Sequence, residues 1–256
     1  MAYTGVRISD AELEEVNRRY EPSHPREVVA WADKRFGRRM AQMSSFAIEG
    51  MSILDMYKKV NPAGRIMTLD TLRLNTETYT LMDQVRHQYK TDIETFYPEM
   101  PSVDKMVREK GYNLFYRGVE NRKLCCEVRK VEPLKRALAG LDAWISGLRR
   151  DQGMERGKIK IVEWDAGHGL YKVNPLANWT YEDARRYVEE NHVPYNVLHD
   201  QGFPSIGCAP CTRAIKPGEP PRAGRWWWES DPNAKECGIH ISPTAAWHDQ
   251  NKAASG

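Results

Sequence analysis

Long apolar runs and an excess of one charge are both missing from this sequence of 256 residues. No hydrophobic run approaches the roughly 18–20 residues that a bilayer-spanning helix needs, so we expect no transmembrane helix and no membrane partner. The opening residues, MAYTGVRISDAELEEV, lack the basic and apolar stretches of a secretory signal. We therefore expect a cytoplasmic protein with reduced thiols.

The net charge is only +3, from 38 Lys and Arg against 35 Asp and Glu. The basic residues cluster at 122–136, 149–160 and 213–235, which indicates an anionic ligand. These clusters are broken by turns and lack the long Lys/Arg stripe with interleaved aromatics that a nucleic-acid groove needs. We therefore expect no nucleic-acid partner.

Internal repeats are also absent, and the length allows one large domain or one domain with an appendage. We divide the chain into a helical segment at 1–39, an α/β domain at 40–200 and a loop-rich part at 201–256. In the last part Gly and Pro are dense and periodicity is weak, which is typical of loops and a tail.

Apolar periodicity predicts strands that alternate with helices. The expected strands lie at 40–46, 65–71, 92–98, 142–149 and 159–165. The expected helices lie at 9–20, 24–36, an apolar segment ending near Lys59 and Val60, 76–90, Pro133 to Leu141, and a segment capped by Thr180 with Asp183 as its box partner. This alternation implies an α/β fold with a mostly parallel, twisted sheet and helices on both faces.

Cysteine is scarce, and four of the five cysteines form two pairs. Cys208-Ala-Pro-Cys211 has the spacing that lets two thiolates face one metal or cluster, and the adjacent Cys125 and Cys126 are a second pair. Four thiolates from two segments would fix the loop-rich part to the sheet. The donor set leaves zinc and an iron–sulfur cluster open, with a redox Cys-x-x-Cys as a third option.

The fifth cysteine, Cys237, lies in KECGIH near the C-terminal end. Lys235 and His240 give it cationic surroundings, which favour the thiolate and therefore a nucleophile. The alternative interpretation is an inert cysteine.

Six motifs follow one another along the chain: CCEVRKVEPLKRAL, SGLRRDQ, LYKVNPLANWT, SIGCAPCTR, GRWWWE and KECGIH. Together, over residues 40–240, they resemble the thioredoxin-dependent assimilatory adenylyl-sulfate (APS) reductases of the PAPS/APS reductase family. The resemblance implies a fold of the adenine-nucleotide pyrophosphatase (PP-loop) type with a flexible C-terminal tail. It implies that residues 40–200 bind the nucleotide and that residues 201–256 hold the cluster-binding loops and the catalytic tail.

By this resemblance the protein is an oxidoreductase of sulfate assimilation and cysteine biosynthesis that reduces APS to sulfite and AMP. Cys237 would attack the sulfur of APS, displace AMP and keep the sulfonate as S-sulfocysteine, and thioredoxin or a glutaredoxin-like reductant would release sulfite. The resemblance also implies a homo-oligomer and one [4Fe–4S] cluster per chain. The implied cluster ligands are Cys125, Cys126, Cys208 and Cys211.

The same motifs imply which cations surround the substrate. Lys130 would lie between the anionic cluster and the anionic APS. A mobile loop over the substrate would carry Arg149, Arg150 and Arg156. The phosphosulfate would be gripped by Arg222 and Arg225, because the guanidinium fork suits such anions.

Other expected contacts are less charged. His240 would bond the sulfate or tune the thiolate, and the packing of Trp226, Trp227 and Trp228 would fix Arg225. Backbone groups of Leu69 and Gly147 would meet the adenine. The phosphate would meet the hydroxyls of Ser44 and Ser45 at a helix N-terminus.

The sequence departs from the family pattern at two places. SSFAIEG, residues 44–50, replaces the Gly-rich Ser-Gly-Gly-x-Asp-Ser turn of related pyrophosphatases, and Leu72 stands where this family is expected to carry glycine. The first 39 residues carry no resemblance. Two alternatives remain: a PAPS reductase, although that class lacks the cluster cysteines, and a zinc-stapled nucleotide-binding module without catalysis.

Overall fold

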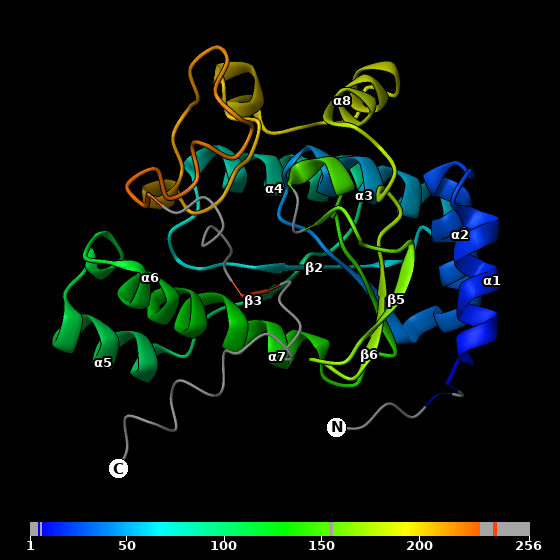
Figure 1. Ribbon diagram of the computed structural model, residues 1–256, viewed down its shortest axis with the longest axis horizontal. Coiled ribbons are helices and arrows are strands. Elements are labelled where there is room, and N and C mark those ends of the chain that lie inside the picture. The colour runs from blue at the N-terminus through cyan, green and yellow to red at the C-terminus, as the bar shows by residue number, and fades with distance from the viewer. Residues whose placement is uncertain (1–4, 6, 154–155, 231–237, 240–256) are drawn as a thin grey trace.

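A six-stranded sheet forms the centre of the computed structural model, which describes residues 5, 7–153, 156–230 and 238–239 (Figure 1). The strand order is β3-β2-β1-β4-β6-β5, and all neighbours are parallel except β5 and β6. The strands are β1 (Met40–Met43), β2 (Arg65–Leu69), β3 (Glu94–Phe96), β4 (Ala143–Ile145), β5 (Val162–Asp165) and β6 (Leu170–Val173). The predicted α/β fold is confirmed.

Helices cover both faces of the sheet (Figure 1). In that view α3, α4 and α8 lie above it, α5, α6 and α7 lie below it, and α1 and α2 stand beside β5. The described α-helices are α1 (Asp10–Tyr20), α2 (Pro25–Phe36), α3 (Ile48–Val60), α4 (Thr76–Tyr89), α5 (Met100–Lys110), α6 (Val119–Cys126), α7 (Glu132–Leu138) and α8 (Tyr181–Glu190). The capping box between Thr180 and Asp183 at α8 is confirmed.

Three elements were not predicted from the sequence. β6 lacks the polar–apolar alternation that marks a strand, because all four of its residues are buried in the sheet. α5 buries only Val103 and Met106, so its apolar stripe is narrow. α6 ends at the adjacent Cys125 and Cys126 and continues into a π-helical turn at Glu127–Val131.

Residues on alternate sides of each strand feed separate hydrophobic cores. Met40 and Ile145 face α2 and α3, whereas Ala41 and Trp144 face α7. A third core lies away from the sheet and contains the four described cysteines together with Phe115 and Trp226. This third core joins the loops after residue 201 to α6, whereas the sequence predicted that the cysteines would fix these loops to the sheet.

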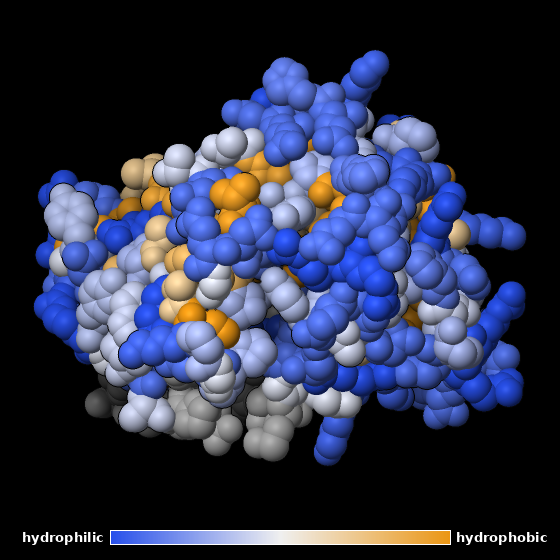
Figure 2. All heavy atoms as spheres, turned by 90° about the horizontal axis from the view of Figure 1, so that it is seen from above, coloured by the Kyte–Doolittle hydropathy of each residue, from blue (hydrophilic) through white to orange (hydrophobic). Residues whose placement is uncertain are grey.

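The chain runs outward from β1 through β2 to β3 and then returns to β4 on the other side of β1. The loops after β1 and β4 therefore separate at the carboxyl edge of the sheet, which is where open α/β sheets bind ligands. Seen from above, most of the molecular surface is hydrophilic, with apolar side chains gathered in small groups (Figure 2). Among the described helices, none combines the length and apolar character that a membrane span requires.

Candidate active site

One cavity of about 230 Å³ opens at this point of the sheet. Nine of the residues expected at the substrate line it: Ser44, Ser45, Leu69, Lys130, Gly147, Arg149, Arg156, Arg222 and Arg225. Arg150 is not part of the lining. Cys237 and His240 lie outside the described residues, but the intervening Ile239 contributes to the wall.

The turn after β1 is built without the glycines of a Gly-rich loop. Phe46 adopts a left-handed backbone conformation with φ of +56°, which costs a non-glycine residue about 1–2 kcal/mol. Its ring is 0% exposed, and this burial offsets the strain. The Phe46 N–H donates to Ser44 Oγ at 3.2 Å, and a Cβ at Gly50 would lie 2.7 Å from that oxygen. Glycine at position 50 therefore leaves room for the Ser44 hydroxyl.

The turn after β2 explains the second departure from the family pattern. Leu72 has φ of +59°, a conformation that glycine adopts without strain. The Leu72 N–H donates to Asp70 Oδ1 at 2.7 Å, and the hydroxyl of Tyr79 donates to the same oxygen at 2.9 Å. These bonds to Asp70 hold the turn in a glycine-like shape although residue 72 carries a side chain.

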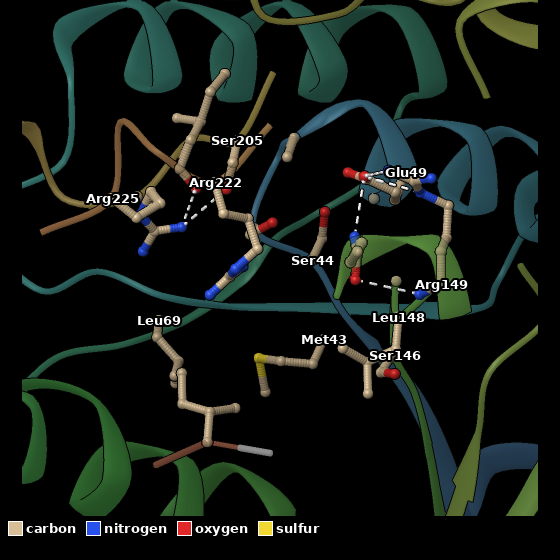
Figure 3. A pocket seen from close by; sticks show the side chains of 18 of the residues that line it. Met43, Ser44, Glu49, Leu69, Ser146, Leu148, Arg149, Ser205, Arg222 and Arg225 are labelled. Carbon is tan, nitrogen blue, oxygen red and sulfur yellow. Dashed lines mark hydrogen bonds and ion pairs between the residues drawn. The ribbon is translucent and has the colours of Figure 1, made fainter. Parts of the chain in front are cut away.

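Arg225 is held by its surroundings on one side of the cavity (Figure 3). It is 7% exposed, its guanidinium lies 4.8 Å from the ring centre of Trp226, and Nη1 donates to Ser205 Oγ at 3.2 Å. A Cβ at Gly207 would lie 2.4 Å from the guanidinium. Gly207 therefore makes the space in which Arg225 lies, and of the three tryptophans expected to pack against Arg225, Trp226 does so.

Glu49 lies on the opposite side of the cavity and was not predicted from the sequence (Figure 3). Its Oε1 accepts hydrogen bonds from Arg149 Nε at 3.1 Å, from Arg149 Nη2 at 3.0 Å and from Gln152 Nε2 at 3.1 Å. Gln152 Oε1 in turn accepts from Arg156. Glu49 thus holds two cavity arginines, one directly and one through Gln152.

A second, smaller cavity brings the four described cysteines together. Its walls contain Cys125, Cys126, Cys208 and Cys211 with Arg73, Arg122, Arg129 and Lys130. Lys130 and Cys208 line both cavities, so the two are neighbours. All four cysteines are buried thiols and not halves of a disulfide. In the part of the chain that the structure describes, no three His, Cys, Asp or Glu side chains form a site for a single metal ion.

The surroundings shift the pKa values of these thiols in different directions. Burial raises the pKa of Cys125, and it raises the pKa of Cys211 to about 12. Burial acts in the same direction on Cys208, but Lys130 and a 3.2 Å contact with the Thr71 hydroxyl outweigh it and lower the pKa. Positive charge is therefore concentrated at Cys208, between the two cavities.

A buried ion pair ties α6 to the end of the C-terminal loops. Arg122 Nε and Nη2 donate to Glu229 at 2.9 and 3.0 Å, and both side chains are nearly inaccessible. We expect Glu229→Gln to lower the free energy of unfolding by about 3 kcal/mol, because it leaves the Arg122 charge buried without its carboxylate. The exposed Asp104 of α5 pairs with Arg108, so Asp104→Asn is the matched control and should cost about 0.3–0.5 kcal/mol. Denaturant unfolding measures both, and equal losses would contradict a role for the buried pair.

His199, which contacts the N-terminus of α3, gives the stability of the folded protein a pH dependence. Its Nε2 accepts the N–H of Ile48 at 3.0 Å, so this nitrogen carries no proton in the folded protein. Burial lowers the pKa of His199, although the nearby Glu49 opposes the shift. As pH falls below about 6.5, the unfolded chain binds a proton that the folded chain excludes, and the folded state loses stability.

We expect His199→Gln to remove this part of the pH dependence, since an amide keeps an acceptor for Ile48 but does not titrate. Unfolding measured between pH 7 and pH 5 should then change less in the variant than in the wild type. His87 is exposed on α4, so His87→Gln should leave the dependence unchanged. The same slope in the wild type and His199→Gln would contradict the assignment.

The sheet order and its helices define an α/β fold of the adenine nucleotide hydrolase-like type. An FMN adenylyltransferase from Candida glabrata shares this fold, with a TM-score of 0.52 at 12% identity over 91% of this chain and 79% of its own. A phosphoadenylyl-sulfate (PAPS) reductase from Candida auris, solved as a phosphate complex, is more similar. Its TM-score is 0.71 at 29% identity, covering 82% of this chain and 100% of its own.

Sequence comparison identifies the family. The model of the phosphoadenosine phosphosulfate reductase domain matches residues 39–214. Adenosine 5′-phosphosulfate reductases from Burkholderia cepacia and Rhizobium tropici are 50% and 51% identical over 78% and 70% of this chain, covering 79% and 98% of their own lengths. The chain therefore belongs to the adenosine 5′-phosphosulfate reductases of this family, which are oxidoreductases.

Proposed function

We propose that this protein reduces APS to sulfite and AMP through an S-sulfocysteine on Cys237, with a thioredoxin-type dithiol as reductant, in sulfate assimilation. The observation that carries the proposal is the adjacency of the two cavities. A cationic nucleotide-sized cavity lies directly against four buried thiols, and Lys130 and Cys208 belong to both walls. A reductase of a sulfonated nucleotide needs this concentration of positive charge beside its substrate.

Different residues of the cavity would bind different parts of APS. The base would lie at Leu69 and Gly147, where backbone groups are available, and a Cβ at Gly147 would come within 3.0 Å of the Glu49 side chain. The phosphosulfate would lie toward Arg222, Arg225 and Lys130, with the Ser44 hydroxyl as a further donor. These fixed cations would stabilise the charge that develops on AMP as it leaves.

The chemistry requires one nucleophile and one external dithiol. The Cys237 thiolate would form a bond to the sulfur of APS while the bond from sulfur to the phosphate oxygen breaks, and AMP would leave with the electron pair. A thioredoxin-type thiolate would then attack the Cys237 sulfur and expel sulfite, and its second thiol would resolve the mixed disulfide. The described residue Ile239 lies on the cavity wall, two residues after Cys237, which supports the reach of this thiol.

The donor set of the second cavity fits a [4Fe–4S] cluster. Four thiols converge there, and the buried Nε of Arg129 has no hydrogen-bond partner among the described residues. A cluster ligated by four thiolates carries about −2 charge, which the surrounding arginines and Lys130 would offset. We assign Cys125, Cys126, Cys208 and Cys211 as its ligands. When bound, the group would supply a covalent tie and negative charge.

Nucleotide selectivity tests the proposal. We expect kcat/KM for APS to exceed that for its 3′-phosphorylated form on the order of 10²-fold, since the added 3′-phosphate would have to be desolvated to enter the site. Sulfite release with thioredoxin and excess reductant measures both substrates. A preference for PAPS would overturn the substrate assignment. Binding of APS without sulfite release would favour a nucleotide-binding module without catalysis.

A further inference from the structure

The segment that follows β4 is held from two sides. Arg149 points to the cavity and is bound by Glu49 and by Asp151. Arg150, the next residue, points the other way, where its two Nη atoms donate to the carboxylate of Glu21. Glu21 follows the last residue of α1 and forms its C-cap. Neighbouring residues of one short segment are therefore fixed to the cavity wall and to the N-terminal helices.

Further bonds lock Arg150 in place. Its backbone N–H donates to the carbonyl of Ala177 at 3.0 Å, and its Nε donates to the carbonyl of Ile159 at 2.9 Å. The amide of Asn178 donates to the backbone carbonyl of Glu21. The Arg150 guanidinium lowers the pKa of Glu21, which agrees with a charged pair. Glu21 thus joins two loops behind the cavity.

The N-terminal helices are themselves firmly attached to the sheet. The side chain of Asn17 in α1 makes two hydrogen bonds to the backbone of the edge strand β5. Its side-chain amide donates to the Val162 carbonyl at 2.8 Å, and its side-chain carbonyl accepts the Val162 N–H at 2.9 Å. Before α1, the N–H of Ile8 donates to the hydroxyl of Tyr171 in β6 at 2.7 Å. Because α1 is fixed to β5 and β6, Glu21 is a rigid point of attachment.

We propose that the N-terminal helices, which precede the family-matched residues 39–214, brace the substrate-binding segment 149–153 from behind, and that Glu21 is the positioning residue of this brace. Its role in substrate binding rests on the proposed function. A bidentate carboxylate–guanidinium pair fixes both position and orientation. Holding Arg150 keeps Arg149 and Gln152 at Glu49, so the cavity arginines are ordered before the anion arrives.

The kinetic test compares two glutamates of the same region. We expect Glu21→Gln to raise KM for APS by about two- to fivefold with kcat nearly unchanged, the pattern of lost uniform binding. Glu15→Gln removes an exposed carboxylate of α1 that pairs with Arg18, and should leave KM unchanged. Arg150→Gln should reproduce the effect, and the double variant with Glu21→Gln should be no worse than either single variant. Equal KM in the wild type and Glu21→Gln would overturn the proposal.

A second measurement is independent of turnover. Trypsin cleaves after Arg149 and Arg150 only when this segment opens locally, so the cleavage rate there should rise about two- to fivefold in Glu21→Gln and not in Glu15→Gln. Unchanged cleavage would overturn the brace whatever the substrate proves to be. Faster cleavage in a protein that does not reduce APS would keep the brace and reject the proposed function.

Discussion

Cys237→Ser should abolish sulfite release while APS still binds. The serine hydroxyl is close in size to the thiol, but it is not ionised at neutral pH and cannot replace the thiolate as nucleophile. Removing a covalent nucleophile lowers kcat on the order of 10⁴-fold or more. The measurement is sulfite release with thioredoxin and excess reductant, together with equilibrium binding of APS.

Trapping identifies the residue that carries the sulfonate. With APS labelled in its sulfate and no reductant present, the wild type should retain label on Cys237, and Cys237→Ser should retain none. Unchanged iron content and APS affinity in Cys237→Ser would show that the variant is folded. Turnover by Cys237→Ser, or label on another residue, would remove Cys237 from the mechanism.

Much of the α/β fold was predictable because strands and helices differ in their apolar period. β2 and α4 fall within segments expected from the sequence, and α8 begins at the expected capping box. β6 could not be predicted, since a strand buried on both faces shows no alternation. β5 runs antiparallel to β6 because the connection between them is too short for the crossover that parallel neighbours need. The sequence did not reveal this direction, since β6 itself was not predicted.

The candidate site was predictable where motif spacing places residues on one loop. Both cysteine pairs reach one cavity, and the residue pair Arg222 and Arg225 reaches the other, as their motifs implied. Arg150 was expected with Arg149, but adjacent residues in extended or turn backbone face different directions. Its partner, Glu21, lies 129 positions away. Glu49 was missed for the same reason, because its partner Arg149 is distant in sequence.

Two residues with left-handed backbone conformation show that a turn can keep its shape although its sequence departs from the family motif. Phe46 and Leu72 occupy positions where glycine would be free of strain, yet both adopt positive φ. The turn geometry is therefore kept by tertiary contacts, through burial of Phe46 and through the Asp70 bond to Leu72. A search for glycine at these positions would have missed both turns. Such a pattern reflects the local backbone preference of a residue and not the tertiary packing that can override this preference.

Cys208→Ala should produce a protein that lacks iron and does not release sulfite. Cys208 belongs to both cavities, so its loss would remove a cluster ligand beside Lys130. A cluster that depends on four thiolates from two segments contributes its binding energy to folding. We expect anaerobically purified wild type to contain iron and acid-labile sulfide in equal amounts and to be brown. Cys208→Ala should be colourless, with activity below about one hundredth of the wild type.

Pro210→Ala is the matched control, because Pro210 lies in the same turn between the two cysteines and offers no thiolate. Its backbone carbonyl, which accepts the Tyr116 hydroxyl at 2.9 Å, remains in the variant. Pro210→Ala should therefore keep its iron, its colour and its activity. Zinc in place of iron in active wild-type protein would reject the cluster, since a zinc site needs no sulfide. Full activity of iron-free Cys208→Ala would show instead that the four thiols only hold the C-terminal loops against α6.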